Sequence, residues 1–228
     1  MISKGITKGA KRIELLFSSE TNDPINFLYP YSLLYKFSFT LLSDTDSLTY
    51  LHLQSCYLLA PFDFSGFKNL RTLLVLQLLN VNQNLLQGLF SNCIHLVNFT
   101  LDQCDLNSDL KITSPTLFHL NIVNCGDQLG RVRNIDIIAS NLSSIEYSFN
   151  SSYPLHIHMM NIQAQILSKF SYRSSQISTY RGGQFTNAFE FSGLKNVTTI
   201  VFDGIQRCLQ DDVIPLLFSE CLQLEPHL

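Results

Sequence analysis

The chain has 228 residues, of which 46% are hydrophobic and 14% are charged, so it can bury a sizeable core and is not expected to be disordered. Its 18 acidic residues outnumber its 15 basic ones, and the formal net charge of −3 argues against a nucleic-acid partner. No secretory signal follows Met1, and the most apolar run, 73–81, is too short to span a bilayer. We therefore expect a protein of the cytoplasm or nucleus with no membrane partner.

The amino-terminal part of the chain offers a tail and two candidate strands. Residues 1–9 carry basic side chains and are expected to form a solvated tail. The next segment predicts a first strand, because apolar side chains occupy alternate positions: Ile13, Leu15 and Phe17. Residues 19–47 contain two prolines and are expected to be mainly loop, although Phe37 and Phe39 alternate with polar residues in a way that favours another strand.

A motif of the form LxxLxLxx(C/V) then recurs along the chain. Clear copies begin at Leu48, Leu73, Leu96 and Leu117, and weaker copies begin at Leu142, Leu167 and Val197. Successive copies start 21 to 30 residues apart, which is close to the roughly 20–29-residue period of leucine-rich repeats. Three copies place a cysteine in the same final slot: Cys56, Cys104 and Cys125.

A second internal similarity predicts helices between some of the strands. Residues 82–96 align without gaps with residues 210–224, and apolar side chains in both segments recur at roughly helical spacing. Both segments lie just before a predicted strand. We expect helices there that return the chain to the next strand on the outer, convex side.

The repeat dictates the fold class. The two apolar residues of LxL share one face of an extended strand, and one repeat alone cannot bury enough apolar surface to be stable. We therefore predict an α/β leucine-rich-repeat solenoid, a curved horseshoe with a parallel concave β-sheet and with short helices, 3-10 turns and loops on its convex side. Residues 10–228 would form about seven to nine irregular repeats. Pro226 lies where a further strand should pair, so we expect a truncated array or a partner covering that end.

The remaining cysteines and the sequons add no expected site. The cysteines lie at positions 56, 93, 104, 125, 208 and 221 without the paired spacing of a zinc site, and are interpreted as reduced thiols. Glycosylation sequons begin at Asn98, Asn141, Asn150 and Asn196, and we interpret them as chance occurrences. We expect neither a metal ion nor a cofactor.

Phrases in the repeats resemble a plant protein family. The segments "FKNLRTLLVLQLLNV", "LFSNCIHLVNFTLDQCDL" and "SPTLFHLNIVNC" are similar to the repeat region of plant F-box/leucine-rich-repeat (F-box/LRR, FBD-like) proteins. The resemblance covers roughly residues 10–224. It implies a substrate-recognition region of an SCF-type, cullin-based E3 ubiquitin ligase. An F-box is not evident in residues 1–47, so binding of the ligase adaptor is expected only if an F-box lies upstream.

The sequence shows no catalytic signature. It contains no GxSxG, HExxH, phosphate-binding loop or GxGxxG motif, and we expect no enzymatic activity. His156 and His158 could share a strand face, but no third metal ligand is evident nearby. The tripeptide at Arg181–Gly183 is interpreted as a loop turn rather than an RNA-binding element.

The candidate functional residues are those that flank the inward leucines. They should form rows on the concave sheet that are polar, mixed in charge and suited to a protein target. The predicted partner-binding residues are Tyr50, His52, Gln54, Gln77, Asn98, Thr100, Asp102, His119, Asn121, Glu146, Lys169 and Arg173. The alternatives are a repeat scaffold or immune-receptor fragment with no ligase role and, from another class, an enzyme.

Overall fold

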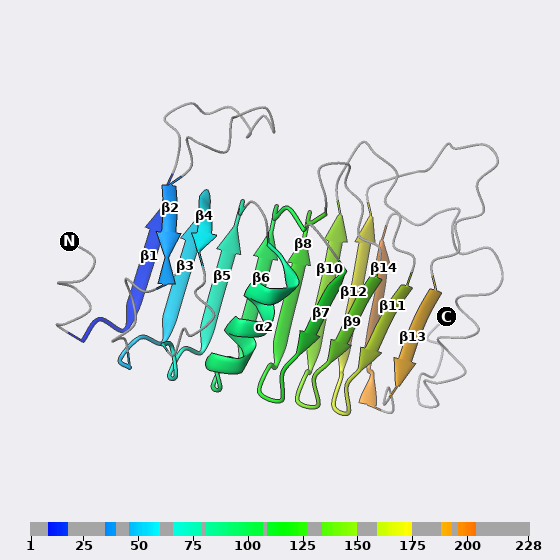
Figure 1. Ribbon diagram of the computed structural model, residues 1–228. Helices are drawn as coiled ribbons and strands as arrows, with labels where there is room; N and C mark the ends of the chain where they lie inside the picture. The colour runs from blue at the N-terminus through cyan, green and yellow to red at the C-terminus, as the bar shows by residue number, and fades with distance from the viewer. Residues whose placement is uncertain are drawn as a thin grey trace, which may run out of the picture.

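The protein is a solenoid of parallel strands in two layers. The computed structural model describes residues 9–17, 35–39, 46–59, 66–78, 81–106, 109–126, 134–149, 159–174, 188–192 and 196–203. Eight strands form one parallel sheet in the order β1-β3-β5-β6-β8-β10-β12-β14 (Figure 1). Their bounds are Arg12–Leu16, Tyr50–Gln54, Thr72–Leu76, Asn98–Asp102, His119–Val123, Ser144–Phe149, Lys169–Ser174 and Thr199–Asp203, respectively.

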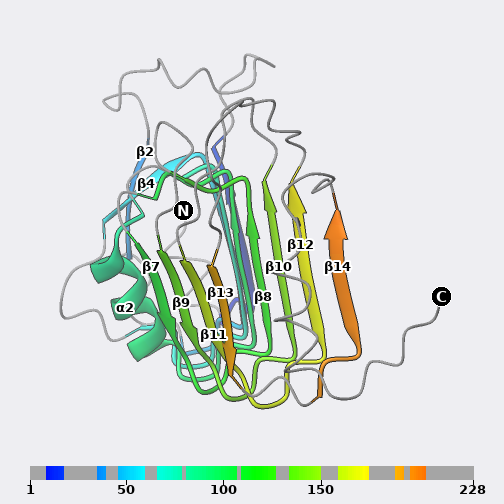
Figure 2. The same cartoon turned by 90° about the vertical axis from the view of Figure 1, so that its right-hand side faces the viewer.

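A second layer lies behind this sheet, as Figure 2 shows. It contains a four-stranded parallel sheet made of β7 (Leu110–Thr113), β9 (Asn134–Ile138), β11 (Met159–Gln163) and β13 (Ala188–Ser192). Towards the amino terminus it contains a two-stranded sheet of β2 (Tyr35–Ser38) and β4 (Cys56–Leu59), followed by helix α2 (Gln83–Asn92). The chain therefore alternates between the two layers from β6 to β14.

The predicted leucine-rich-repeat solenoid is confirmed, but its back is built mainly of strands. In the described part of the chain, α2 confirms the helix predicted in 82–96, whereas the segment 210–224 lies outside the described residues. The predicted strand around Phe37 exists, although it pairs with β4 rather than with the eight-stranded sheet. The strand predicted around Ile13 is β1.

Helix α2 is fixed at both its start and its buried face. Asn82 caps it by accepting a hydrogen bond from the Leu85 amide at 3.0 Å, and Phe90 packs edge-on against Phe99 of β6. The side chain of Gln83 both donates to the carbonyl of Lys111 and accepts from its amide, at 2.9 and 3.0 Å. The Gln83 side chain thus pairs with both backbone hydrogen-bonding groups of Lys111 on the edge strand β7.

The in-register pairing of the front strands creates continuous buried rows. One row contains the first inward residue of each strand, such as Leu51, Phe99 and Leu120, and the next contains the second, such as Leu101 and Ile122. These side chains and those of the back strands belong to one hydrophobic core. Each turn therefore completes the burial of the turns beside it.

Backbone and side-chain hydrogen bonds repeat just before the front strands. The carbonyl of the residue directly before each front strand, from Lys11 to Ser168, accepts hydrogen bonds from two backbone amides of the next turn. For example, the Arg71 carbonyl accepts from the amides of Val97 and Asn98, both at 2.9 Å. Three asparagines that precede a buried apolar residue also bridge turns. Their side-chain amides donate to a carbonyl of the preceding turn: Asn69 to Asp46 at 2.6 Å, Asn141 to Pro115 at 2.7 Å and Asn196 to Gln165 at 2.8 Å.

The alignment of the β5 repeat is wrong by three residues, and with it the row position predicted for Gln77. The inward residues of β5 are Leu73 and Val75, so this copy begins at Leu70 rather than Leu73. Gln77 follows the strand with φ of 54°, in the same left-handed position as Ser55, Gln103 and Asn124. Its side chain accepts from Ser55 Oγ at 2.7 Å and donates to Gln103 Oε1 at 3.3 Å, so it links the turns instead of lying in the predicted row.

The cysteines at the end of the repeat motif lie inside the core. Cys56, Cys104 and Cys125 are buried free thiols, and the thiol of Cys125 donates to the Val123 carbonyl at 3.2 Å. Cys93, after α2, is also buried. Burial raises the pKa of Cys56 and of Cys93 to about 12. Cys208 and Cys221 lie outside the described residues.

Leu101→Asp is expected to destabilise the domain by about 3–5 kcal/mol, because it places an unpaired charge in the shared apolar layer. Leu101 is fully buried, whereas its neighbour Asp102 points to the other side of the sheet. Asp102→Ala should therefore leave the thermal unfolding midpoint nearly unchanged. Equal midpoints for the two variants would contradict the strand register.

Cys56 and Cys93 are expected to resist alkylation by iodoacetamide at pH 8 in the folded protein. Their pKa values of about 12 leave roughly one thiol in ten thousand ionised at that pH, and only the thiolate reacts. Peptide mass spectrometry should find both residues labelled only after denaturation, which also serves as the control. Labelling of the native protein at the rate of a free thiol would contradict their burial.

Candidate functional site

The candidate site is the outward side of the eight-stranded sheet, which we call the front face. Alternate residues of each strand point towards it and align across strands in three rows. Row 1 is Arg12, Tyr50, Thr72, Asn98, His119, Ser144, Lys169 and Thr199. Row 2 is Glu14, His52, Leu74, Thr100, Asn121, Glu146, Ser171 and Val201. Row 3 contains Leu16, Gln54, Leu76, Asp102, Val123, Ser148 and Arg173.

Eleven of the twelve predicted partner-binding residues lie in these rows; Gln77 is the exception. Tyr50, Asn98, His119 and Lys169 fall in row 1; His52, Thr100, Asn121 and Glu146 in row 2; and Gln54, Asp102 and Arg173 in row 3. In the predicted place of Gln77 the structure has Leu74. Ser171 belongs to row 2 by register but is fully buried, so it adds nothing to the accessible surface.

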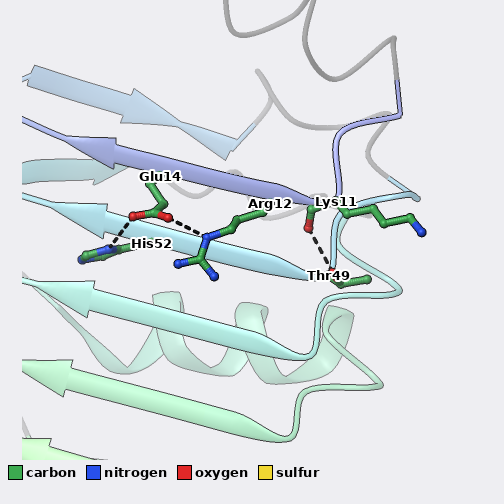
Figure 3. Close-up of polar contacts among 5 residues, drawn as sticks. All are labelled: Lys11, Arg12, Glu14, Thr49 and His52. Carbon is green, nitrogen blue, oxygen red and sulfur yellow. Dashed lines mark hydrogen bonds and ion pairs between the residues drawn. The ribbon is translucent and has the colours of Figure 1, made fainter.

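The amino-terminal end of the front face carries a charged cluster on β1 and β3 (Figure 3). Glu14 lies between Arg12, at 2.6 Å, and His52, at 3.7 Å, and the Arg12 guanidinium stacks 3.6 Å from the centre of the Tyr50 ring. The hydrogen bond from Arg12 lowers the pKa of Glu14 and raises that of Arg12. Thr49 donates its hydroxyl to the Lys11 carbonyl at 3.0 Å and joins the same two strands.

The carboxyl-terminal half of the front face is also cross-linked by polar contacts between strands. Arg173 of β12 pairs with Glu146 of β10 at 3.1 Å. His119 Nδ1 lies 2.6 Å from the hydroxyl of Ser144 on the next strand. Such contacts hold side chains in fixed positions along the sheet, and they leave mixed charge on its surface.

The middle of the front face contains an apolar patch that the sequence alignment missed. Leu74 and Leu76 of β5 and Val123 of β8 point outward and are half-buried. Asp102 lies between Leu76 and Val123 in row 3, and burial raises the pKa of its carboxyl group. The three-residue error at Leu73 had placed Leu74 and Leu76 elsewhere in the repeat. Val123 belongs to a correctly aligned copy but was left out of the predicted rows, which contained only polar residues.

The described residues also bear on metal binding and on membrane insertion. Among them, no group of three or more His, Cys, Asp or Glu side chains could hold a metal ion. None of the helices within those ranges is long and apolar enough to cross a membrane. His156, His158 and Arg181–Gly183 lie outside the described residues, so the interpretations given for them stay predictions.

Comparison with known proteins identifies the repeat type. A family model described as "At1g61320/AtMIF1, LRR domain", named for a plant protein, matches residues 2–188. No curated protein matches the chain, and no solved structure matches it either. Leucine-rich-repeat domains generally bind protein partners, and their solenoids are typically non-catalytic interaction scaffolds. The matched model covers most of the chain, which therefore belongs to the At1g61320/AtMIF1 leucine-rich-repeat domain family of plant proteins.

Proposed function

We propose that this domain holds a protein target on its front face, as the substrate-recognition repeat region of a plant F-box/LRR subunit of an SCF-type ubiquitin ligase. The observation that carries the proposal is the alignment of outward side chains in rows across eight parallel strands. Membership of a plant leucine-rich-repeat family supports the binding role. The resemblance of its repeats to F-box/LRR proteins supports the connection with ubiquitin ligation.

The front face has the physical properties that protein recognition requires. Its side chains are placed on strands rather than on loops, and several are held by ion pairs or hydrogen bonds between strands, such as Arg173 with Glu146 and His119 with Ser144. A surface that is fixed before binding loses less conformational entropy when a partner binds. The mixed charge of the rows allows electrostatic selection of that partner.

Asn121→Arg is expected to reduce capture of the protein target by about tenfold, because it places a long charged side chain in the centre of the proposed interface. Asn121 is half-buried in row 2 of the front face. The matched control is Asn161→Arg, at a half-buried position on the outer face of the back sheet. The measurement is quantitative proximity labelling in plant cells; equal recovery of the same labelled proteins with both variants would contradict the assignment of the face.

The ligase connection is tested by recovery of the cullin-ligase adaptor with the full-length product of the gene from plant tissue. The adaptor is expected to co-precipitate with the wild-type protein and with Asn121→Arg, since this substitution changes only the proposed target surface. Depletion of the protein should also lengthen the half-life of the captured target. A captured target without adaptor, and with an unchanged half-life, would favour the non-ligase scaffold instead.

A further inference from the structure

We propose that the centre of the front face binds a partner segment in which a lysine or arginine lies next to a large apolar side chain, with Asp102 taking the cation and Leu74, Leu76 and Val123 taking the apolar group. This inference rests on the proposed function and names the chemistry of the partner. We call these residues the central patch. It lies on three neighbouring strands, β5, β6 and β8.

The first observation is that Asp102 differs from the other front-face carboxylates. Glu14 pairs with Arg12 and lies near His52, and Glu146 pairs with Arg173. Asp102 makes no ion pair within the described part of the chain, and its Oδ1 atom is buried without a hydrogen-bond partner. Among the described front-face carboxylates, it is thus the one whose charge is left for a partner to neutralise.

The second observation is that apolar side chains flank this carboxylate. In row 3, Leu76 and Val123 lie on the strands to either side of Asp102. Asp102 is already partly removed from water, and this burial raises its pKa. Because part of the desolvation has occurred before binding, an arriving cation gains more from this carboxylate than from a fully hydrated one.

The spacing of the central patch limits the partner's sequence. Adjacent strands lie about 4.8 Å apart, and residues two apart on one strand are about 7 Å apart. Leu74, which faces Thr100, is therefore diagonal to Asp102 by about 8 Å. A cation and an apolar side chain two positions apart in an extended segment, about 7 Å, fit this separation. A pair three to four positions apart in a helix, about 5–6 Å, fits the shorter distance from Asp102 to Leu76 or Val123 on the adjacent strands.

The test is selection of a library of random peptides displayed on phage against the full chain, followed by affinity measurements on the enriched peptides. The wild-type protein is expected to enrich peptides with Lys or Arg at one of those spacings from a large apolar residue. Asp102→Asn should weaken their binding by about tenfold or more, and the weakening should shrink at high salt. Leu76→Ser should weaken it with little change in salt dependence.

The matched control is Asp136→Asn, the same substitution on the outer face of the back sheet, where the carboxylate pairs with Lys111 at 3.5 Å. It should leave peptide affinity unchanged. Asp102→Asn should not lower the thermal unfolding midpoint, because the folded state already disfavours the ionised carboxyl. A loss of binding by a folded Asp102→Asn variant is therefore a surface effect.

Three results would overturn this inference. Enriched peptides that lack a cation, or that bind wild type and Asp102→Asn with equal affinity, would contradict the proposed partner chemistry. If Asn121→Arg still abolished the binding of such peptides, the proposed function of the front face would stand. Failure to enrich any peptide would exclude recognition of a short linear segment here. A dimer of this chain that Asp102→Asn dissociates, measured by light scattering, would assign the central patch to a second copy instead of a separate partner.

Discussion

The structure depends on the parallel, in-register pairing of successive front strands. This pairing stacks Leu51 on Leu73, Leu73 on Phe99 and Phe99 on Leu120, so the inward side chains of β3 to β12 are covered by the turn before and the turn after. Because neighbouring turns share their apolar layers, no turn reaches native burial alone. Hydrogen bonds before the front strands maintain the same register. They come from the paired backbone amides that donate to one carbonyl and from the asparagine side chains that bridge turns.

The same register produces the candidate binding face. Since the inward rows are fixed, the outward residues between them must also align, and their spacing across the sheet follows the strand spacing. Polar contacts such as Glu14 with His52 and Glu146 with Arg173 then link neighbouring strands near the two ends of this face. The central patch around Asp102 lies between these linked ends. The front face is thus a direct consequence of core packing, and its chemistry varies with the outward residues alone.

Much of this arrangement could be predicted from the sequence because the repeat is strongly patterned where burial is complete. Leu51 with Leu53 and Leu120 with Ile122 mark their strands clearly, and all are fully buried. The β5 copy was misaligned because "LRTLLVLQLLNV" has leucines that fit two frames. The structure decides between them through Asn69, whose side chain bonds to Asp46 and fixes Leu70 as the first residue of the copy. For that reason Leu74 was absent from the rows predicted for the front face.

The back of the solenoid was less predictable, since its strands do not carry the recurring LxxLxLxx(C/V) motif of the front strands. In β9, Ile135 and Ile137 alternate with exposed or half-buried residues, and β7 has Leu110 and Ile112 in the same pattern. Without a recurring motif, four- or five-residue segments of this kind carry little local signal for a strand. Helix α2 was predicted because its buried residues recur over several turns. Long-range pairing, rather than local preference, therefore decides the structure of this layer.

The continuous stacking of front strands is tested most directly by a pulsed electron spin resonance distance between nitroxides introduced at Thr72 and Thr199. Both residues lie in row 1, separated by five strand spacings along β5-β6-β8-β10-β12-β14, which corresponds to about 24 Å between backbones. A single narrow distance distribution consistent with that separation is the predicted result. A broad distribution, or a distance incompatible with five stacked strands, would contradict the shared core on which the account rests.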